Sequence, residues 1–348
     1  MTTIAIESRR VFRRTDDYTP GTPKLKLTYE DLPSRLPSSS VLIKVHAVSL
    51  NYRDANIVNG GNPWPVIPHG IPCNDAAGEV IATGADVKTL KLGDRVAPII
   101  DTENITGRES ARSWLAADED GVLADYLIFD ERILSIVPSH LSWAEACLIP
   151  CAGTTAWAAL KGFGIGKSVL IQGTGGVSMF ALKLARAAGL QVILSSSSDD
   201  KLQQIKAQFS SPPLLTVNYK SPVWHEEVLK LTGDAGVDLV LEMGGTGSLV
   251  QSIRCTRRGG TVSQIGYLSR QDPSDLAELL PVLIDRRVNL RGINAASKYD
   301  MDDLCAALSA MQLHLDDIID TTYFFEQSGE AIQSIWEGKH VGKLVVSL

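Results

Sequence analysis

A glycine-rich segment, Gly173-Thr174-Gly175-Gly176-Val177-Ser178, follows a short apolar run and precedes a segment with helical periodicity. Glycines let a backbone approach a ligand closely, and the N–H groups at a helix N-terminus favour negative charge. The pattern departs from the dinucleotide-binding fingerprint at its third position, where Ser178 stands instead of Gly or Ala. Its place between a strand and a helix predicts a site for a dinucleotide pyrophosphate, with a plain glycine turn as the alternative.

A run of serines, Ser195 to Ser198, stands about twenty residues beyond the first of these glycines, where an NAD site has an Asp or Glu for the ribose 2′-hydroxyl. Hydroxyl groups can bind a 2′-phosphate, and the ammonium of Lys201 can pair with it. We therefore predict NADP(H) as the cofactor, with Ser196, Ser197 and Lys201 at the phosphate. The alternative is that the serines cap the next helix, with Ser198 as its N-cap.

The surrounding apolar runs indicate how these residues are positioned. Beyond about residue 153, six near-continuous apolar runs alternate mostly with helical patterns, which predicts a doubly wound parallel sheet. Before that point the chain favours antiparallel strands, because β-branched residues alternate at 41–48, and 78–96 predicts two strands joined at Gly84. A helix at about 301–313 and a last strand at 343–346 follow the parallel sheet. The runs of that sheet lie at 168–172, 191–194, 214–217, 237–243, 261–266 and 288–293.

Length and charge limit the classes of function. The 348 residues exceed the roughly 250–300 at which one core stops growing, so we expect two domains. Forty Asp and Glu against thirty-three Lys and Arg give a net charge of −7, which argues against nucleic acid and anionic membranes as partners. No apolar stretch reaches the roughly 18 residues that span a bilayer, and we expect a cytoplasmic protein. The five cysteines form no paired C-x-x-C motif, so we expect free thiols.

Six motifs follow one another along nearly the whole chain: Asn51-Tyr52-Arg53-Asp54, residues 71–80, 92–96 and 152–157, the glycine segment, and 338–343. Together they resemble the medium-chain dehydrogenase/reductase superfamily, in its zinc-independent, quinone-reductase-like and enoyl-reductase-like branch. The resemblance implies an α/β protein with a GroES-like β-rich catalytic domain at 1–153 and 297–348 and a Rossmann domain at 154–296. The cofactor-binding residues that it adds are Thr155, Tyr219, Gly244, Gly245, Gly266, Tyr267, Leu268 and Lys343.

Zinc-containing members carry Cys, His and Cys at the positions that match Asn51, Asn74 and Cys151, so one ligand of three remains. Neutral amides are poor zinc ligands, and a catalytic zinc needs three protein ligands. The resemblance therefore implies a site without metal. His69 and Cys73 offer an alternative pair of ligands, although an ordinary surface histidine is the simpler interpretation.

The chemistry follows from the missing metal. Reducing a simple ketone without a Lewis acid requires strong donors for the oxyanion, whereas an enone or quinone spreads the charge over several atoms. We expect NADPH-dependent hydride transfer to a quinone or an α,β-unsaturated carbonyl compound. Asn51, Tyr52 and Asp54 are the candidate catalytic residues, because the resemblance sets them beside the nicotinamide. Alternatively, Tyr52 packs, Arg53 and Asp54 form a structural ion pair, and water or the cofactor ribose supplies the proton.

Two further functions stay open. One is a zinc-independent alcohol dehydrogenase or ketone reductase, and the other is a non-catalytic NADPH-binding structural or regulatory protein. The substrate is a small molecule whose size the sequence does not specify. Trp64 and Trp114 either stack on a planar substrate or fill the surface of the domain. A homodimer formed by pairing of sheet edges is a further expectation.

Overall fold

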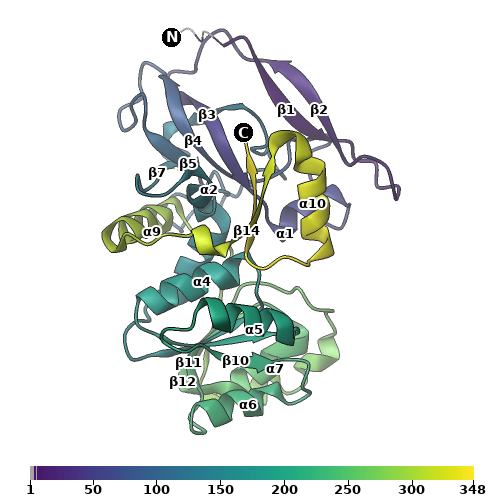
Figure 1. Cartoon of the computed structure of the whole chain (residues 1–348), viewed down its shortest axis with the longest axis vertical. Coiled ribbons are helices and arrows are strands. Elements are labelled where there is room, and N and C mark those ends of the chain that lie inside the picture. Colours follow the sequence, from purple (N-terminus) through teal and green to yellow (C-terminus); the bar gives the residue numbers. More distant parts are fainter. Residues whose placement is uncertain (1–3, 5) are drawn as a thin grey trace. The chain divides into compact units, whose positions relative to one another are not determined.

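The computed structural model describes residue 4 and residues 6–348, which divide into two compact units (Figure 1). Unit 2 is the continuous segment Thr155–Ala295, and unit 1 contains the chain up to Thr154 together with Ala296–Leu348. The described helices are all too short or too polar to cross a membrane.

Unit 2 contains a six-stranded parallel sheet in the order β10-β9-β8-β11-β12-β13. This order confirms the predicted doubly wound sheet. The central strands are buried along their length, as expected for apolar runs covered on both faces. The strands are β8 (Ser168–Gln172), β9 (Gln191–Ser196), β10 (Leu215–Asn218), β11 (Val237–Glu242), β12 (Thr256–Gln264) and β13 (Asn289–Gly292).

The helices of unit 2 connect these strands and supply the apolar faces that cover the sheet. In the helix that follows the glycine segment, Phe180 and Leu184 are buried one turn apart, which is the spacing of a single helix face. The helices are α3 (Thr154–Leu160), α4 (Gly176–Ala187), α5 (Asp199–Gln208), α6 (Trp224–Leu231), α7 (Thr246–Cys255) and α8 (Leu279–Arg286), with a 3₁₀ turn at Pro273–Leu276.

Unit 1 is built on a seven-stranded sheet and a separate hairpin. The sheet has the order β14-β15-β3-β4-β5-β7, and β6 also pairs with β3. The hairpin strands are β1 (Ser8–Arg14) and β2 (Leu25–Asp31). The sheet strands are β3 (Ser40–Ser49), β4 (Asp75–Thr83), β5 (Arg95–Pro98), β6 (Tyr126–Asp130), β7 (Leu134–Ile136), β14 (Ile319–Phe324) and β15 (Lys343–Ser347).

The helical segments of unit 1 are short except near the C-terminus. A single π-helical turn at Ile149–Gly153 leads into α3. The helices are α1 (Tyr52–Val58), α2 (Trp143–Ala146), α9 (Lys298–Met311) and α10 (Ser328–Glu337), with 3₁₀ turns at Glu131–Ile133, Asp316–Ile318 and Phe325–Gln327.

The last strand returns to the first part of the chain. In Figure 1 the yellow C-terminal strands lie beside the blue strands of the same unit, and β15 pairs antiparallel with β3, Val345 opposite Ser49. The last strand that the sequence predicted therefore completes the sheet of unit 1, and the predicted helix, α9, belongs to the same unit.

The segment 78–96 differs from its prediction. The first strand begins earlier, at Asp75, and the second, β5, begins only at Arg95, so residues 84–94 form a connection of eleven residues. Gly84 is not a turn between adjacent strands. A Cβ atom there would lie 2.3 Å from the carbonyl oxygens of Pro37 and Ser38, so Gly84 permits a close approach of two backbones.

Candidate functional site

The glycine segment begins directly after β8. Gly173 has a φ of +81°, which favours glycine, and its N–H donates to the carbonyl oxygen of Ser195, 2.8 Å away. Gly175 precedes the first turn of α4, and a Cβ atom there would meet nothing within 4 Å. The Ser178 hydroxyl is buried and donates to the carbonyl oxygen of Gln172 at 2.7 Å, which fixes the helix to the strand. The open space at Gly175, above the N-terminus of a helix, fits a pyrophosphate.

A buried carboxylate lies beneath this segment. Glu242, at the end of β11, is fully buried, and its Oε1 accepts from the N–H groups of Gly244 at 2.8 Å and Gly245 at 3.1 Å and from the Ser248 hydroxyl. Its Oε2 accepts from the Gln172 side-chain amide at 2.7 Å and from the Ser252 hydroxyl. Gln172 precedes Gly173, so one carboxylate links the glycine segment to the Gly244–Gly245 loop. Neither Glu242 nor Gln172 was predicted from the sequence, although each is a polar residue at or next to the end of an apolar run.

The predicted phosphate-binding residues follow β9. Ser196 is buried, and its carbonyl oxygen accepts from the N–H of Tyr219 at 3.1 Å. The Ser198 hydroxyl accepts from the Lys201 N–H at 3.3 Å, so Ser198 caps α5 as the alternative interpretation stated. The structure thus brings Ser196, Lys201 and the half-exposed Tyr219 to the carboxyl ends of β9 and β10.

Two carboxylates that the sequence analysis overlooked lie beside these residues. Asp199 and Asp200 occupy the first turn of α5 and are exposed, and Asp199 accepts from the side-chain amide of Asn218 at 2.7 Å. They directly follow the serine run, so the sequence carried the signal. Their negative charge opposes that of a 2′-phosphate.

The remaining predicted cofactor loops lie at the same edge of the sheet, where the parallel strands β11 and β12 end. Leu268 donates its N–H to the carbonyl oxygen of Met243 at 3.0 Å, which joins the two loops. Tyr267 and Leu268 expose more than half of their surface. Thr155 is buried in α3. Such an edge is where open parallel sheets bind their ligands.

The candidate catalytic residue Asn51 is held by charged side chains of unit 1. Its Oδ1 accepts from Nζ of Lys343 at 2.7 Å, and its Nδ2 donates to Oδ2 of Asp75 at 2.9 Å. Its backbone N–H donates to Oδ2 of Asp54 at 2.8 Å. Lys343 comes from β15, is 2% exposed, and also donates to the carbonyl oxygen of Leu50 at 2.7 Å. The structure therefore places Lys343, predicted among the cofactor-binding residues, in the Asn51 group.

Burial dominates the electrostatics of this group. Burial raises the pKa of Asp54 to about 6. The charge of Arg53, the hydrogen bond from the Asn51 N–H and the charge of Lys343 lower it by less. Burial also raises the pKa of Asp75 to about 7, against the ammonium of Lys343 and the Asn51 amide. The pKa of the Cys151 thiol is raised to about 12 by burial and by the charge of Asp75, so this thiol keeps its proton at neutral pH.

The other two residues of the Asn51–Asp54 motif point to different surroundings. The Tyr52 ring is half-exposed and stacks on Trp336 of α10, with the ring centroids 6.2 Å apart, so the structure does not bring it to Asp75 and Lys343. Arg53 donates from Nη1 to the carbonyl oxygen of Leu115 at 3.0 Å and to Oδ1 of Asn74 at 3.4 Å.

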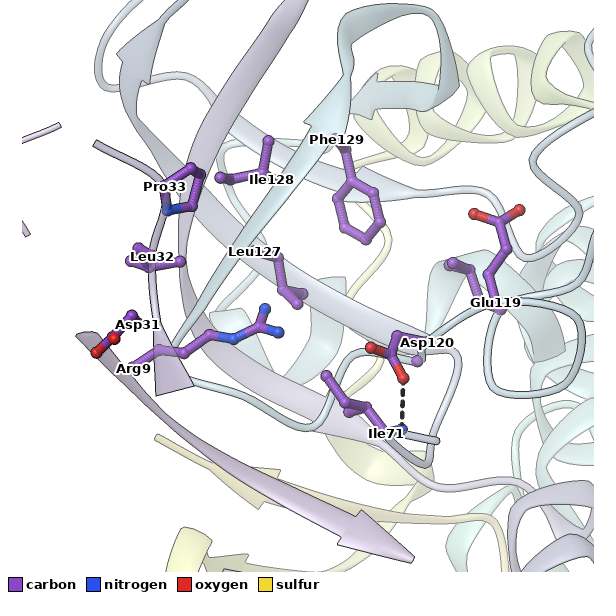
Figure 2. A pocket seen from close by; sticks show the side chains of 12 residues that line it. Arg9, Asp31, Leu32, Pro33, Ile71, Glu119, Asp120, Leu127, Ile128 and Phe129 are labelled. Carbon is purple, nitrogen blue, oxygen red and sulfur yellow. Dashed lines mark hydrogen bonds between the residues drawn. The ribbon is translucent and has the colours of Figure 1, made fainter. Parts of the chain in front are cut away.

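A hollow of about 330 Å³ opens elsewhere in unit 1, between the hairpin and β6 (Figure 2). Leu127 and Phe129 line it, with Arg9 and Asp31 at one end. Its lining contains none of the predicted site residues. Arg9 is paired with Glu30 at 2.9 Å, which leaves its guanidinium partly engaged. We therefore describe two candidate sites, the Asn51 group within unit 1 and the glycine segment within unit 2.

Comparisons with known proteins agree with this arrangement. The family model "Alcohol dehydrogenase GroES-like domain" matches residues 37–139, and "Zinc-binding dehydrogenase" matches residues 176–310. A zinc-type alcohol dehydrogenase-like protein of Schizosaccharomyces pombe is 35% identical over 338 residues, which cover 94% of this chain and 96% of that protein. The chain belongs to the medium-chain dehydrogenase/reductase superfamily. It is an oxidoreductase of a family that binds nicotinamide cofactors.

Solved structures show the same fold. A crystal structure described as an alcohol dehydrogenase from Sinorhizobium meliloti is 31% identical, with a TM-score of 0.87, over 99% of this chain and 100% of that one. The 2-octenoyl-CoA carboxylase reductase CinF, solved with NADP and 2-octenoyl-CoA, is 21% identical, with a TM-score of 0.82, over 99% of this chain and 88% of that one. The second likeness concerns the fold alone.

The residues at the family's zinc positions do not fit a zinc ion. The amide oxygen of Asn51 accepts from an ammonium, and that of Asn74 accepts from the Arg53 guanidinium. Both amide nitrogens donate to Asp75. Cys151 is thus the one usual zinc ligand among these three positions, and a catalytic zinc needs three protein ligands. The described residues also contain no group of three or more His, Cys, Asp or Glu side chains that suits a metal.

Proposed function

We propose that the protein is an NADPH-dependent, zinc-independent oxidoreductase that reduces a small quinone or α,β-unsaturated carbonyl compound. The observation that carries this proposal is the Asn51 amide, whose oxygen accepts from Lys343 and whose nitrogen donates to Asp75. Where a metal-dependent relative would hold a cation for the substrate, this chain holds a neutral donor between two charged side chains.

In this proposal unit 2 binds NADPH, which supplies the hydride. The glycine segment binds the pyrophosphate, and Ser196, Ser197 and Lys201 bind the 2′-phosphate. The further residues that contact the cofactor are Thr155, Tyr219, Gly244, Gly245, Gly266, Tyr267 and Leu268. Lys343 acts through Asn51 instead, because its ammonium is bound within unit 1.

Asn51 polarises the acceptor. A side-chain amide has two N–H donors, and Asp75 takes one of them. The second N–H is available to the carbonyl or quinone oxygen. The ammonium on Oδ1 withdraws electron density from the amide and strengthens this donor, because charge-assisted hydrogen bonds polarise their partners. A single amide donor suits a charge that is spread over an enolate better than one that is localised on an alkoxide. The S. pombe relative is described as zinc-type, so the test below also asks whether activity depends on zinc.

The test compares a conjugated enone with its saturated ketone. We expect NADPH oxidation with the enone by protein treated with a chelator, and little or none with the ketone. Asn51→Ala should lower kcat by about a hundredfold or more, the usual effect of removing an oxyanion donor. Turnover of the ketone alone would favour a ketone reductase. NADPH binding without oxidation of any enone or quinone would favour a non-catalytic protein, and loss of activity on removal of zinc would refute the metal-free mechanism.

A further inference from the structure

Arg53 has a hydrogen-bonding group without an acceptor. Its Nη1 donates to Leu115 and Asn74, whereas its Nη2 is buried and has no hydrogen-bond partner in the described part of the chain. Burying an N–H donor of a cation without an acceptor is unfavourable, and such groups in folded proteins generally have a reason. An acceptor that arrives with a ligand would satisfy it.

The surroundings of Arg53 are cationic and aromatic. The guanidinium of Arg53 lies over the indole of Trp114, 5.3 Å from the ring centroid, and that of Arg112 lies over the same indole at 4.6 Å. The Trp64 indole packs edge-on against Trp114, with the centroids 6.4 Å apart. These residues line a small hollow in unit 1 with a volume of about 10 Å³, which is room for one oxygen atom.

The charge at this hollow is positive. Among the described residues that line it, two guanidinium groups face one carboxylate, that of Asp118. Oδ2 of Asp118 accepts from the backbone N–H of Trp114 at 2.9 Å, so part of its hydrogen-bonding capacity is already used. A planar, weakly hydrated guanidinium is suited to binding a carboxylate or another anionic oxygen.

The hollow is connected to the Asn51 group through hydrogen bonds. Nη1 of Arg53 donates to Oδ1 of Asn74, and Nδ2 of Asn74 donates to Oδ1 of Asp75 at 2.9 Å. The other oxygen of Asp75 holds Asn51. The unsatisfied guanidinium and the amide that polarises the acceptor are therefore parts of one group within unit 1.

We propose that Arg53 and Arg112 bind an anionic group of the substrate, so that the acceptor is a conjugated carbonyl compound bearing a carboxylate or a similar negative charge. An oxygen of this group occupies the hollow that both side chains line. Because Nη2 of Arg53 is closed to solvent in this structure, the proposal requires the guanidinium to shift as the group binds, so that Nη2 donates to it. Trp64 and Trp114 contact the planar conjugated part. This inference rests on the proposed function, because the proposed function places the carbonyl oxygen of the acceptor at the Asn51 amide.

Binding of an unreactive ketone acid tests the subsite. Levulinate, a saturated ketone with a carboxylate, is compared with its neutral methyl ester by calorimetry on the NADPH-loaded protein. We expect levulinate to bind at least about tenfold more tightly than the ester, as one charge-assisted contact provides. Raising the salt from about 0.05 M to about 0.5 M should weaken binding of levulinate and leave that of the ester nearly unchanged.

Three variants locate the effect. Arg112→Met alters an exposed side chain, and Arg53→Met alters a half-buried one. Each should reduce the preference for levulinate by about fivefold or more. Arg53→Lys retains the charge and should restore part of it. Arg108→Met is the matched control, because Arg108 is exposed on the same loop and does not line the hollow. If Arg53→Met fails to fold, the Arg112 variant and the salt dependence decide.

Equal affinity for levulinate and its ester, absence of levulinate binding, or a preference that Arg112→Met leaves intact would overturn the subsite. Turnover of 4-oxo-2-pentenoate and its methyl ester distinguishes this result from failure of the proposed function. If both are reduced with the same KM, the subsite is wrong and the reductase stands. If levulinate binds through its charge and neither enone is reduced, the anion subsite stands and the proposed reaction is wrong.

Discussion

The Asn51 side chain is fixed at the level of single atoms. Lys343 and Asp75 lie 3.7 Å apart and are almost fully buried, and both contact the Asn51 amide. A buried ion pair contributes little net stability, but removing one partner typically costs about 3–5 kcal/mol because it leaves the other charge unpaired. Lys343 and Asp75 therefore fix the orientation of the Asn51 amide, and replacement of either one would disturb that orientation.

The cofactor preference can be tested at Lys201. Lys201→Ala should weaken NADPH binding by about 1.5–3 kcal/mol, the value of a charge-assisted contact, and should change NADH binding little. Affinities of both cofactors are measured for the wild type and the variant. Lys206→Ala is the control, because Lys206 lies exposed in the last turn of the same helix. Equal losses for the two cofactors would contradict the assignment.

A second residue-level prediction concerns the pH dependence of stability. The pKa of Asp54 rises from 3.8 to about 6 on folding, so the stability that its protonated form contributes is fully present below about pH 4 and is lost as the pH rises through about 6. Asp54→Asn should not show this loss. Relative to the wild type, the variant should therefore gain up to about 3 kcal/mol between pH 4 and pH 7, at about 1.4 kcal/mol per unit. Thermal denaturation across this range measures the difference, and parallel profiles would refute it.

At the scale of elements, local sequence patterns were sufficient to predict the parallel sheet of unit 2. The glycine segment and the apolar runs predicted the parallel sheet because each signal depends on residues that are neighbours in sequence. Lys343 is different, since it reaches Asn51 across 292 residues, and only the pairing of β15 with β3 brings the two together. No sequence window of helical or strand length contains that contact.

Tyr52 illustrates another limit of the sequence. It adjoins Asn51, yet α1 begins at Tyr52, and consecutive residues of a helix diverge instead of facing the same side. Asp54 lies three residues beyond Asn51, so it returns to the side of Asn51 and accepts its N–H. The resemblance set Tyr52 beside the nicotinamide together with Asn51 and Asp54, and in the structure its ring stacks on Trp336, apart from the group around Asn51.

The hydrogen bonds through which Glu242 links the glycine segment to the Gly244–Gly245 loop can be tested by substitution. Each oxygen of Glu242 accepts from at least two donors, so Glu242→Gln would turn an N–H donor toward groups that also donate. We expect the Kd for NADPH to rise about tenfold, with a smaller change in kcat at saturating NADPH. The control is Glu226→Gln on the exposed side of α6. An unchanged Kd would show that the two loops do not depend on this carboxylate.

At the scale of the whole molecule, we expect a homodimer formed through β13. This strand is at the end of its sheet, and the neighbouring helix α8 has no buried residue. Leu280 and Ile284 of α8 are 66% and 72% exposed. An open strand edge beside exposed apolar side chains suits pairing with the same surface of a second copy about a two-fold axis.

Light scattering after size exclusion tests this arrangement. The wild type should have twice the mass of the chain, and Ile284→Glu should shift it toward the monomer, because the charge would be buried at the interface. Val223→Glu is the control, since Val223 is 45% exposed and follows β10, which is at the other end of the sheet from β13. A monomeric wild type would contradict the prediction.

The split composition of unit 1 also determines the order in which the protein is assembled during synthesis. The ribosome releases all of Thr155–Ala295 after β3 and before β15, so unit 2 can fold while the sheet of unit 1 is incomplete. At roughly 5–20 residues per second, this interval lasts on the order of ten seconds. Throughout it, the end of β3 nearest Asn51 lacks one strand, and Asp75 lacks its ammonium partner. The nascent chain can thus complete the fold of unit 2 before its Asn51 group, which requires β15.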